Sequence, residues 1–416
     1  MNILKFFTAG SVDDGKSTLI GRMLYDTDSI LADQLEALQS SNRKNDDGTI
    51  DLAILTDGLR AEREQGITID VAYKYFQTDK RKFIIADTPG HIQYTRNMVT
   101  GASTATLAII LIDARNGVVE QTIRHSYLVS LLGIKHVVVC INKMDMVDYS
   151  ETVFSAITDK YRILAGQLNL KDVTFIPVSA LKGDNVVQKS ERMVWYGGES
   201  LLHFLETVEI EADDDVKLSR FPVQWVIRPQ TDALHDYRGY AGRIAAGKFR
   251  VNDRVTVLPG GSSSVISRIE IFDQQPEEAQ AGQSVTIHLK DDIDISRGDL
   301  IVNAENLPLQ SKMIEADLCW MDTRALDPSL TYFLQHNSKL TRCKVSEIIY
   351  KIDINTLEKH SSDEFRLNDI GRVILKTADE LPFDLYDDSR ENGAAILVDS
   401  RNNLTVGAVM FRADVA

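Results

Sequence analysis

The sequence predicts an α/β domain, with a mostly parallel sheet and helices on both faces, followed by two antiparallel β-barrel domains. From residue 3 to about 208, short apolar runs alternate with longer amphipathic segments, which is typical of a parallel sheet covered by helices. After an acidic stretch at 209–215, the hydrophobic period falls to two and Gly-rich turns follow closely, which indicates antiparallel barrels. The 416 residues are enough for two or three such domains.

The apolar runs give each element of the first domain an expected position. Strands are expected at 3–9, 69–77, 82–86, 106–112, 136–141 and 173–178. The first helix is expected at about 17–25 and the last at about 199–208. Two barrels fit the remaining length, with a joint near 304–312. We therefore expect domains at 1–210, 211–306 and 307–416.

Composition narrows the classes of function. The formal charge is −15, from 46 Lys and Arg against 61 Asp and Glu, which opposes broad attraction to nucleic acid or anionic membranes. No apolar run approaches the roughly 20 residues that span a bilayer, and the opening residues are typical of a strand rather than a signal peptide. The three cysteines form no metal-ligand spacing and suit reduced thiols in a core. We expect a cytoplasmic protein.

One stretch between the first predicted strand and helix matches the pattern G-x-x-x-x-G-K-[ST]. It comprises Gly10, Ser11, Val12, Asp13, Asp14, Gly15, Lys16 and Ser17, and Thr18 follows it. Such a loop directs backbone N–H groups at anionic oxygens beside the positive end of a helix. We expect Lys16 to bridge the β and γ phosphates of a nucleotide and the Ser17 hydroxyl to ligate Mg²⁺. The alternative is a Gly-rich turn with a solvated lysine.

Two further motifs suit a phosphate switch. The long polar stretch 28–68 ends in E-Q-G-I-T, and its Thr68 is placed to reach Mg²⁺ and a γ-phosphate, although a lone threonine there is also an ordinary β-former. The strand at 82–86 leads into D-T-P-G-H, residues 87–91. Asp87 then supplies negative charge to the water shell of Mg²⁺, and Gly90 lets a backbone N–H approach the γ-phosphate.

The fourth motif, N-K-x-D at 142–145, carries base specificity. A carboxylate at Asp145 can accept hydrogen bonds from the N1–H and N2–H₂ groups of guanine, which adenine does not offer there. Asn142 would brace the loops and the Lys143 stem would cover the ring face. A second segment comprises Ser179, Ala180 and Leu181, and the Ala180 N–H is expected to meet guanine O6.

In this order and spacing, the four motifs resemble those of translation-factor-type GTPases, which implies an α/β P-loop GTPase domain that binds GTP or GDP with Mg²⁺. The resemblance implies that His91 positions the hydrolytic water, with Lys16 and Thr68 as the other catalytic residues, and that Ser17, Thr68 and Asp87 hold the metal. Asp13 is either a ligand of a monovalent cation or a cap of the turn.

Departures from the elongation factors point to one branch of this superfamily. Those factors usually have His where this chain has Asp14, and E-R-G-I-T where it has E-Q-G-I-T. These differences resemble the GTPase-subunit family of bacterial sulfate adenylyltransferases (ATP sulfurylases). Further similar segments are 21–27, 195–198, 220–224, 236–242, 350–357 and 367–373. The resemblance implies a role in sulfate assimilation, with GTP hydrolysis coupled to formation of adenosine 5′-phosphosulfate and pyrophosphate from ATP and sulfate. It places that adenylyl transfer on a separate small catalytic subunit, in a heterodimer or larger assembly.

Two other functions fit the same motifs. An elongation-factor-like GTPase carrying aminoacyl-tRNA would need a basic face on the barrels, which the acidic balance and Asp14 disfavour, so neither nucleic acid nor a membrane is an expected partner. A GTP-dependent scaffold without coupled catalysis is the other.

A second G-x-x-x-x-G-K at 242–248 is followed by Phe249 and no helical pattern, so we interpret it as a strand and turn.

Overall fold

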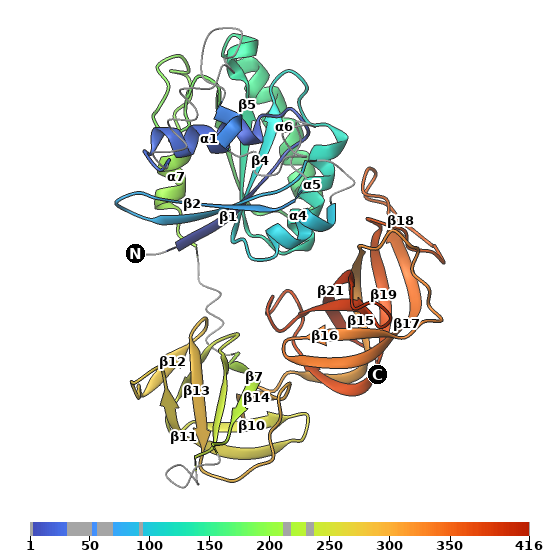
Figure 1. The fold of residues 1–416 in the computed structure, drawn as a ribbon. Helices are drawn as coiled ribbons and strands as arrows, with labels where there is room; N and C mark the ends of the chain where they lie inside the picture. The colour runs from blue at the N-terminus through green and yellow to red at the C-terminus, as the bar shows by residue number, and fades with distance from the viewer. Residues whose placement is uncertain are drawn as a thin grey trace. The chain divides into compact units, whose positions relative to one another are not determined.

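The computed structural model describes residues 3–30, 52–55, 70–90, 95–210, 218–229 and 237–415. They form two compact units: residues 1–210 make up nearly all of the first, and two β-barrels make up the second (Figure 1). Thr68 and His91 lie outside the described residues. In the described ranges, no helix is long and apolar enough to cross a membrane.

The first unit is built on a six-stranded sheet of order β2-β3-β1-β4-β5-β6. The strands are β1 Ile3–Ala9, β2 Ala72–Gln77, β3 Lys82–Asp87, β4 Leu107–Asp113, β5 His136–Asn142 and β6 Asp172–Pro177. All neighbours are parallel except the edge strand β2, which is antiparallel to β3. The six predicted strands are confirmed. β2 starts later than expected because Ala72 already pairs with Asp87, where its only partner strand ends.

Helices cover both faces of this sheet, as predicted (Figure 1). On one face lie α1 Lys16–Asp26 and α7 Leu201–Thr207, whose leucines share a buried cluster with Leu4, Phe6 and alternate residues of the neighbouring strands. The other face carries α4 Thr95–Ala102, α5 Glu120–Leu131 and α6 Glu151–Gln167. Two short 3-10 turns are η1 Leu52–Leu55 and η3 Met144–Val147. Because β4 is buried on both faces, it is apolar at every position except its last, Asp113.

The second unit begins with a closed barrel of order β10-β11-β13-β8-β7-β14. Its strands are β7 Arg220–Ile227, β8 Gly239–Arg243, β10 Arg254–Leu258, β11 Ser262–Glu270, β13 Ser284–Leu289 and β14 Leu300–Asn303. A small two-stranded sheet adds β9 Lys248–Arg250 and β12 Glu278–Gln280. The Lys248 of the second G-x-x-x-x-G-K therefore opens a strand, and Phe249 is fully buried in the barrel core, which confirms that interpretation.

The second barrel has the order β16-β20-β21-β15-β19-β17, closed by β16–β17 pairing, with β18 added beside β17. The strands are β15 Leu309–Trp320, β16 Tyr332–His336, β17 Lys339–Ile352, β18 Lys359–His360, β19 Ile370–Phe383, β20 Ala394–Asp399 and β21 Thr405–Asp414. All pairings in both barrels are antiparallel, as predicted. Cys140, Cys319 and Cys343 are buried and unpaired, as expected of core thiols.

A buried ion pair joins the two barrels. Arg220, at the start of β7, is fully buried and contacts Asp384, just after β19, through Nε and Nη2 at 2.7 and 2.9 Å. Its Nη1 donates to the Asn306 carbonyl at 2.8 Å, and Asn392 donates to Asp384 at 2.8 Å. Because every charged atom has partners, the pair holds the barrels in one arrangement without leaving an uncompensated charge.

Removing one half of this pair should be costly. We expect Asp384→Ala to destabilise the barrels by about 3–5 kcal/mol, because it strands the buried Arg220 charge. The matched control is Asp387→Ala, which removes a carboxylate that is 76% exposed and should cost less than about 1 kcal/mol. Urea unfolding, followed by the fluorescence of Trp225 and Trp320 in the barrels, measures the change in unfolding free energy of both variants. Equal shifts in the two variants would contradict a structural role for the pair.

Candidate nucleotide site

Strand order brings the predicted site residues to one edge of the sheet. The parallel strands β1, β3, β4 and β5 are neighbours, so their carboxyl ends meet there. The loop 10–15 follows β1, residues 87–90 close β3, and Asn142 closes β5. The segment 179–181 follows β6. The residues that the sequence singled out thus converge from segments far apart in the chain.

The loop after β1 wraps around its own lysine. Lys16 is buried, and its Nζ donates to the carbonyl oxygens of Gly10 and Ser11 at 2.9 and 3.2 Å. Gly15 has φ +90°, and a Cβ there would lie 2.5 Å from Asn142 Nδ2, so only glycine fits. Burial lowers the pKa of Lys16, and the nearby carboxylates of Asp87 and Asp14 oppose that shift. The loop is thus a compact cradle around one buried amine.

Asp14, rather than Asp13, caps this turn. The Asp14 carboxylate accepts the Ser11 N–H at 2.5 Å, and burial raises its pKa above the ordinary value. The Asp13 side chain is exposed, and its backbone lies at φ +69°. Of the two roles predicted for Asp13, the cap belongs to its neighbour, and the monovalent-cation site stays a prediction. Val12 is exposed, while Ser17 and Thr18 lie half-buried in the first turn of α1.

The segment after β3 packs directly on the loop. A Cβ at Gly90 would lie 2.5 Å from both the Gly10 carbonyl oxygen and Lys16 Nζ, so a side chain there would displace one of them. Asp87 is buried, and the Thr8 hydroxyl donates to it at 3.4 Å. Ser17 and Asp87 offer hydroxyl and carboxylate oxygens, which are the ligands Mg²⁺ prefers, so the residues fit that metal.

Helix α5 holds this segment from behind, which sequence reasoning missed. Gln121 Nε2 donates to the Gly90 carbonyl at 2.9 Å and lies 2.9 Å from His125 Nε2. Burial, with smaller effects from Lys16 and Arg124, lowers the pKa of His125 to about 3, so the ring is neutral and can accept that hydrogen bond. The two residues lie four positions apart on one helix face, but polar residues are common along α5, so no pattern in the sequence singled them out.

Asn142 ties the loop 10–15, called the phosphate loop for its predicted role, to the segment 179–181, called the base-side loop for the same reason. Its Nδ2 donates to the Asp14 carbonyl at 2.7 Å, and its Oδ1 accepts the Ala180 N–H at 2.9 Å. That N–H, predicted to meet guanine O6, is therefore already engaged, and a base would have to share it. The Ser179 hydroxyl donates to Asp145 Oδ1 at 2.6 Å, which fixes the carboxylate predicted to select guanine.

Lys143 is held by an acidic group that the sequence reasoning did not select. Its Nζ lies 3.0 Å from Asp113 Oδ2 and also donates to the Asp13 carbonyl. Arg115 donates to both oxygens of Asp113, from Nε to Oδ1 at 3.0 Å and from Nη2 to Oδ2 at 2.6 Å. Burial alone would raise the pKa of Asp113, but the hydrogen bonds from Arg115 and Lys143 outweigh it and hold the pKa at about 2. The sequence feature that could have pointed to Asp113 is its position as the single charged residue at the end of the apolar strand β4.

Arg22 of α1 anchors the base-side loop. Its Nε donates to the Ala180 carbonyl at 3.2 Å and its Nη2 to the Leu181 carbonyl at 2.7 Å. The segment 21–27 had only marked the resemblance at sequence level. The structure gives this arginine a physical task, because it fixes a loop some 158 residues away along the chain.

Two family comparisons agree with this geometry. The family described as "Elongation factor Tu GTP binding domain" matches residues 1–212, and the family described as "GTP-eEF1A C-terminal domain-like" matches residues 313–412. The first unit is therefore a GTP-binding domain of the elongation factor Tu type.

Close relatives extend the similarity to nearly the whole chain. "Sulfate adenylyltransferase subunit 1" of Bacteroides fragilis (strain YCH46) is 51% identical over 99% of this chain and 87% of its own length. The protein of that name from Cellvibrio japonicus (strain Ueda107) is 52% identical over 98% of this chain and 86% of its own length. This chain belongs to the sulfate adenylyltransferase subunit 1 family.

The depressed pKa of Asp113 makes a pH-dependent prediction. Its folded pKa of about 2 lies below the ordinary 3.8, so the ionised group stabilises the fold above about pH 4 and this contribution is lost as pH falls toward 2. We expect Asp113→Asn to be less stable than wild type at pH 5–7, with a difference that shrinks from pH 4 to 2. Urea unfolding across this range measures it, with the exposed Asp79→Asn as control. A difference that is constant with pH would contradict the assignment.

Proposed function

We propose that this chain is the GTP-hydrolysing regulatory subunit of a sulfate adenylyltransferase. GTP hydrolysis here would be coupled to formation of adenosine 5′-phosphosulfate and pyrophosphate from ATP and sulfate on a small catalytic partner subunit. The observation that carries the proposal is the 51% identity to a subunit of that name across 99% of the chain. The convergence of four phosphate- and base-binding segments at one sheet edge supports it.

The phosphates of GTP would take the place of the carbonyls that now hold Lys16. Its Nζ would exchange the Gly10 and Ser11 oxygens for β- and γ-phosphate oxygens, and the N–H groups of the loop would surround the rest. Ser17, Thr68 and Asp87 would hold Mg²⁺, which supplies positive charge to the β- and γ-phosphate oxygens. Thr18, in the first turn of α1, is also predicted to contact the nucleotide.

His91 would orient the attacking water, next to a glycine that the protein fixes on both sides. Gly90 abuts Lys16, and Gln121 holds its carbonyl. Loss of the γ-phosphate would remove contacts from Gly90 and Thr68 together, and the segments that carry them would relax. A coupling of this type transmits about 1–3 kcal/mol, so driving a strongly uphill reaction requires linkage over several steps.

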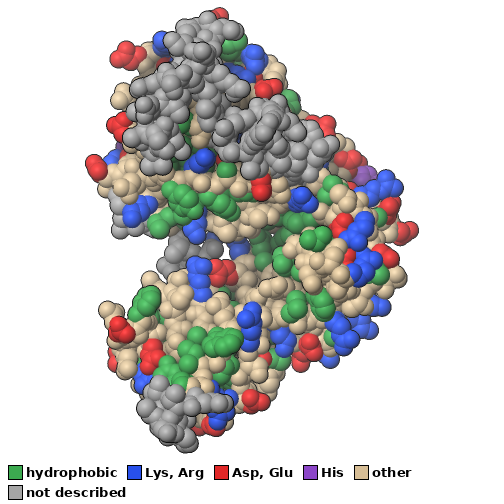
Figure 2. Space-filling view, in the orientation of Figure 1, with side chains coloured by type: hydrophobic (Ala, Val, Ile, Leu, Met, Phe, Trp, Pro, Cys, Tyr) green, Lys and Arg blue, Asp and Glu red, His purple; other side chains and the backbone are tan. Residues whose placement is uncertain are grey.

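A carrier of aminoacyl-tRNA is the less favoured alternative. Basic and acidic side chains are interspersed on the face of the described molecule in Figure 2. This mixing of charges, together with the net charge of −15, does not favour binding to the phosphate-rich surface of RNA. The partner that suits the proposal is instead a protein subunit.

Reconstitution tests the coupling. We expect the chain, mixed with the small subunit of the same organism, to accelerate sulfate-dependent pyrophosphate release from ATP with GTP but not with a non-hydrolysable GTP analogue. Lys16→Ala is the control that should abolish the stimulation, because it removes the cation expected at the phosphates. A rate indifferent to GTP would favour a scaffold, and tight, salt-sensitive retention of tRNA would favour the carrier.

Base selection has its own test. We expect Asp145→Asn to weaken GTP binding at least about a hundredfold and to favour xanthosine triphosphate, because the amide donates where guanine also donates. Asp148→Asn, an exposed carboxylate three positions along, should leave the preference unchanged. Titration calorimetry with both nucleotides measures it. An unaltered preference for guanine in Asp145→Asn would refute the role of that carboxylate.

A further inference from the structure

One backbone carbonyl at the edge of the candidate site is held in a fixed direction. The Gly90 carbonyl oxygen accepts a hydrogen bond from Gln121 Nε2 of α5 at 2.9 Å. Because a peptide group is planar, this bond fixes the direction in which the backbone leaves Gly90. On its other side Gly90 packs so closely that a Cβ would lie 2.5 Å from the Gly10 carbonyl oxygen and from Lys16 Nζ. Gly90 is therefore confined between the phosphate loop and α5.

The Gln121 amide is in turn held by a buried histidine. His125 lies one helical turn further along α5, is 1% exposed, and places its Nε2 atom 2.9 Å from Gln121 Nε2. Its low pKa keeps the ring neutral, so Nε2 accepts a hydrogen bond from the amide and the ring proton sits on Nδ1. The amide thus uses both of its N–H groups, one on the Gly90 carbonyl and one on the imidazole.

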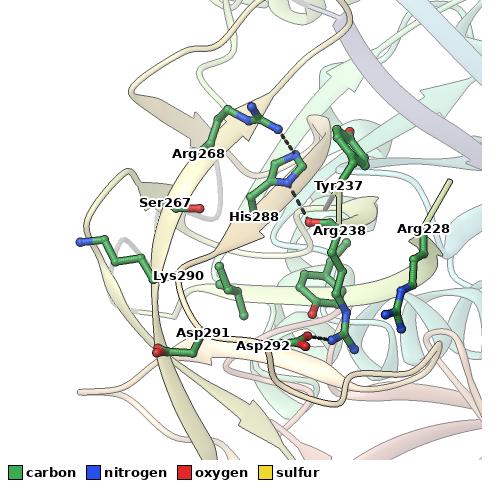
Figure 3. Close-up of a pocket in the computed structure, with 11 residues that line it drawn as sticks. Arg228, Tyr237, Arg238, Ser267, Arg268, His288, Lys290, Asp291 and Asp292 are labelled. Carbon is green, nitrogen blue, oxygen red and sulfur yellow. Dashed lines mark hydrogen bonds and ion pairs between the residues drawn. The ribbon is translucent and has the colours of Figure 1, made fainter. Parts of the chain in front are cut away.

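The imidazole at position 125 is not explained by stability alone. Its Nδ1 atom is buried and has no hydrogen-bond partner among the residues that the structure describes. His288 of the first barrel shows the usual arrangement, with Nδ1 2.8 Å from the Arg238 carbonyl and Nε2 3.3 Å from Arg268 Nη2 (Figure 3). A buried donor without an acceptor is destabilising, and an apolar side chain would avoid that cost. The contact with Gln121 is what an apolar side chain could not supply.

Helix α5 is a firm support for this pair. The Ser126 hydroxyl lies 2.8 Å from the Tyr161 hydroxyl of α6, and both side chains are fully buried. The Ser130 hydroxyl donates to the Leu168 carbonyl at the end of α6, also at 2.8 Å. Gln121 projects from the first turn of the same helix. Its position is therefore set by packing that lies outside the nucleotide site.

We propose that Gln121 and His125 are positioning residues for GTP hydrolysis, an inference that rests on the proposed function. Gln121 holds the Gly90 carbonyl, and His125 holds Gln121. Together they set the direction in which the backbone leaves Gly90 toward His91, the residue proposed to orient the attacking water. Hydrolysis depends on the exact placement of that water, whereas nucleotide affinity depends on the phosphate loop and the base-side loop. Loss of the pair should therefore slow hydrolysis and leave affinity unchanged.

Separate measurements of hydrolysis and binding on the full chain test this division. Single-turnover GTP hydrolysis is followed with the small subunit of the same organism present, and GDP affinity is measured by calorimetry with Mg²⁺. We expect Gln121→Met, which keeps the length of the side chain but cannot donate, to slow hydrolysis about tenfold or more at unchanged GDP affinity. The control is Ser130→Ala, which removes a hydrogen bond from the same helix to a different carbonyl and should leave the rate unchanged.

The variant His125→Leu separates positioning from structural support. It replaces the imidazole with an apolar side chain of similar volume, so the unfolding free energy in urea should not fall, yet hydrolysis should slow. Combined with Gln121→Met it should slow hydrolysis no further, because both act through one carbonyl.

Three results would overturn the inference alone: an unchanged rate in Gln121→Met, a rate that falls only together with GDP affinity or stability, or equal slowing in Ser130→Ala. A wild-type chain that neither binds nor hydrolyses GTP would contradict the proposed function, and this inference with it.

Discussion

The candidate nucleotide site depends on one side chain, Asn142, because its amide is the point where the loop 10–15 and the segment 179–181 meet. Donation to the Asp14 carbonyl and acceptance from the Ala180 N–H use both ends of the amide at once. Gly15 has no side chain because the same amide occupies that space. The spacing between the loop 10–15 and the segment 179–181 is therefore set by a single planar group.

The surrounding charges reinforce this arrangement. Lys16 and Lys143 each donate to carbonyls of the phosphate loop, so the loop is held by cations from inside and outside. Asp14 closes the turn from within by capping Ser11. This cap gives physical meaning to the residue at which the chain departs from the elongation factors. The carboxylate at position 14 stabilises the loop because it accepts a hydrogen bond from the Ser11 backbone N–H.

The fold and the location of the site could be predicted because their signals are local. Strand positions followed from apolar runs, and three of the four motifs, at 10–17, 87–91 and 142–145, came directly after such a run. The contacts that hold the site could not be predicted. Pairing of Asp113 with Lys143 requires β4 beside β5, and the reach of Arg22 to residues 180 and 181 depends on the packing of α1.

The buried Arg220–Asp384 pair has a mechanical consequence. Two domains joined only by a linker can rotate relative to each other at the linker. Such a rotation would break the buried Arg220–Asp384 pair, which has a high free-energy cost, so the two barrels are expected to move together. A small rotation imposed on one barrel would then move the other with it, because separating them would break the buried pair.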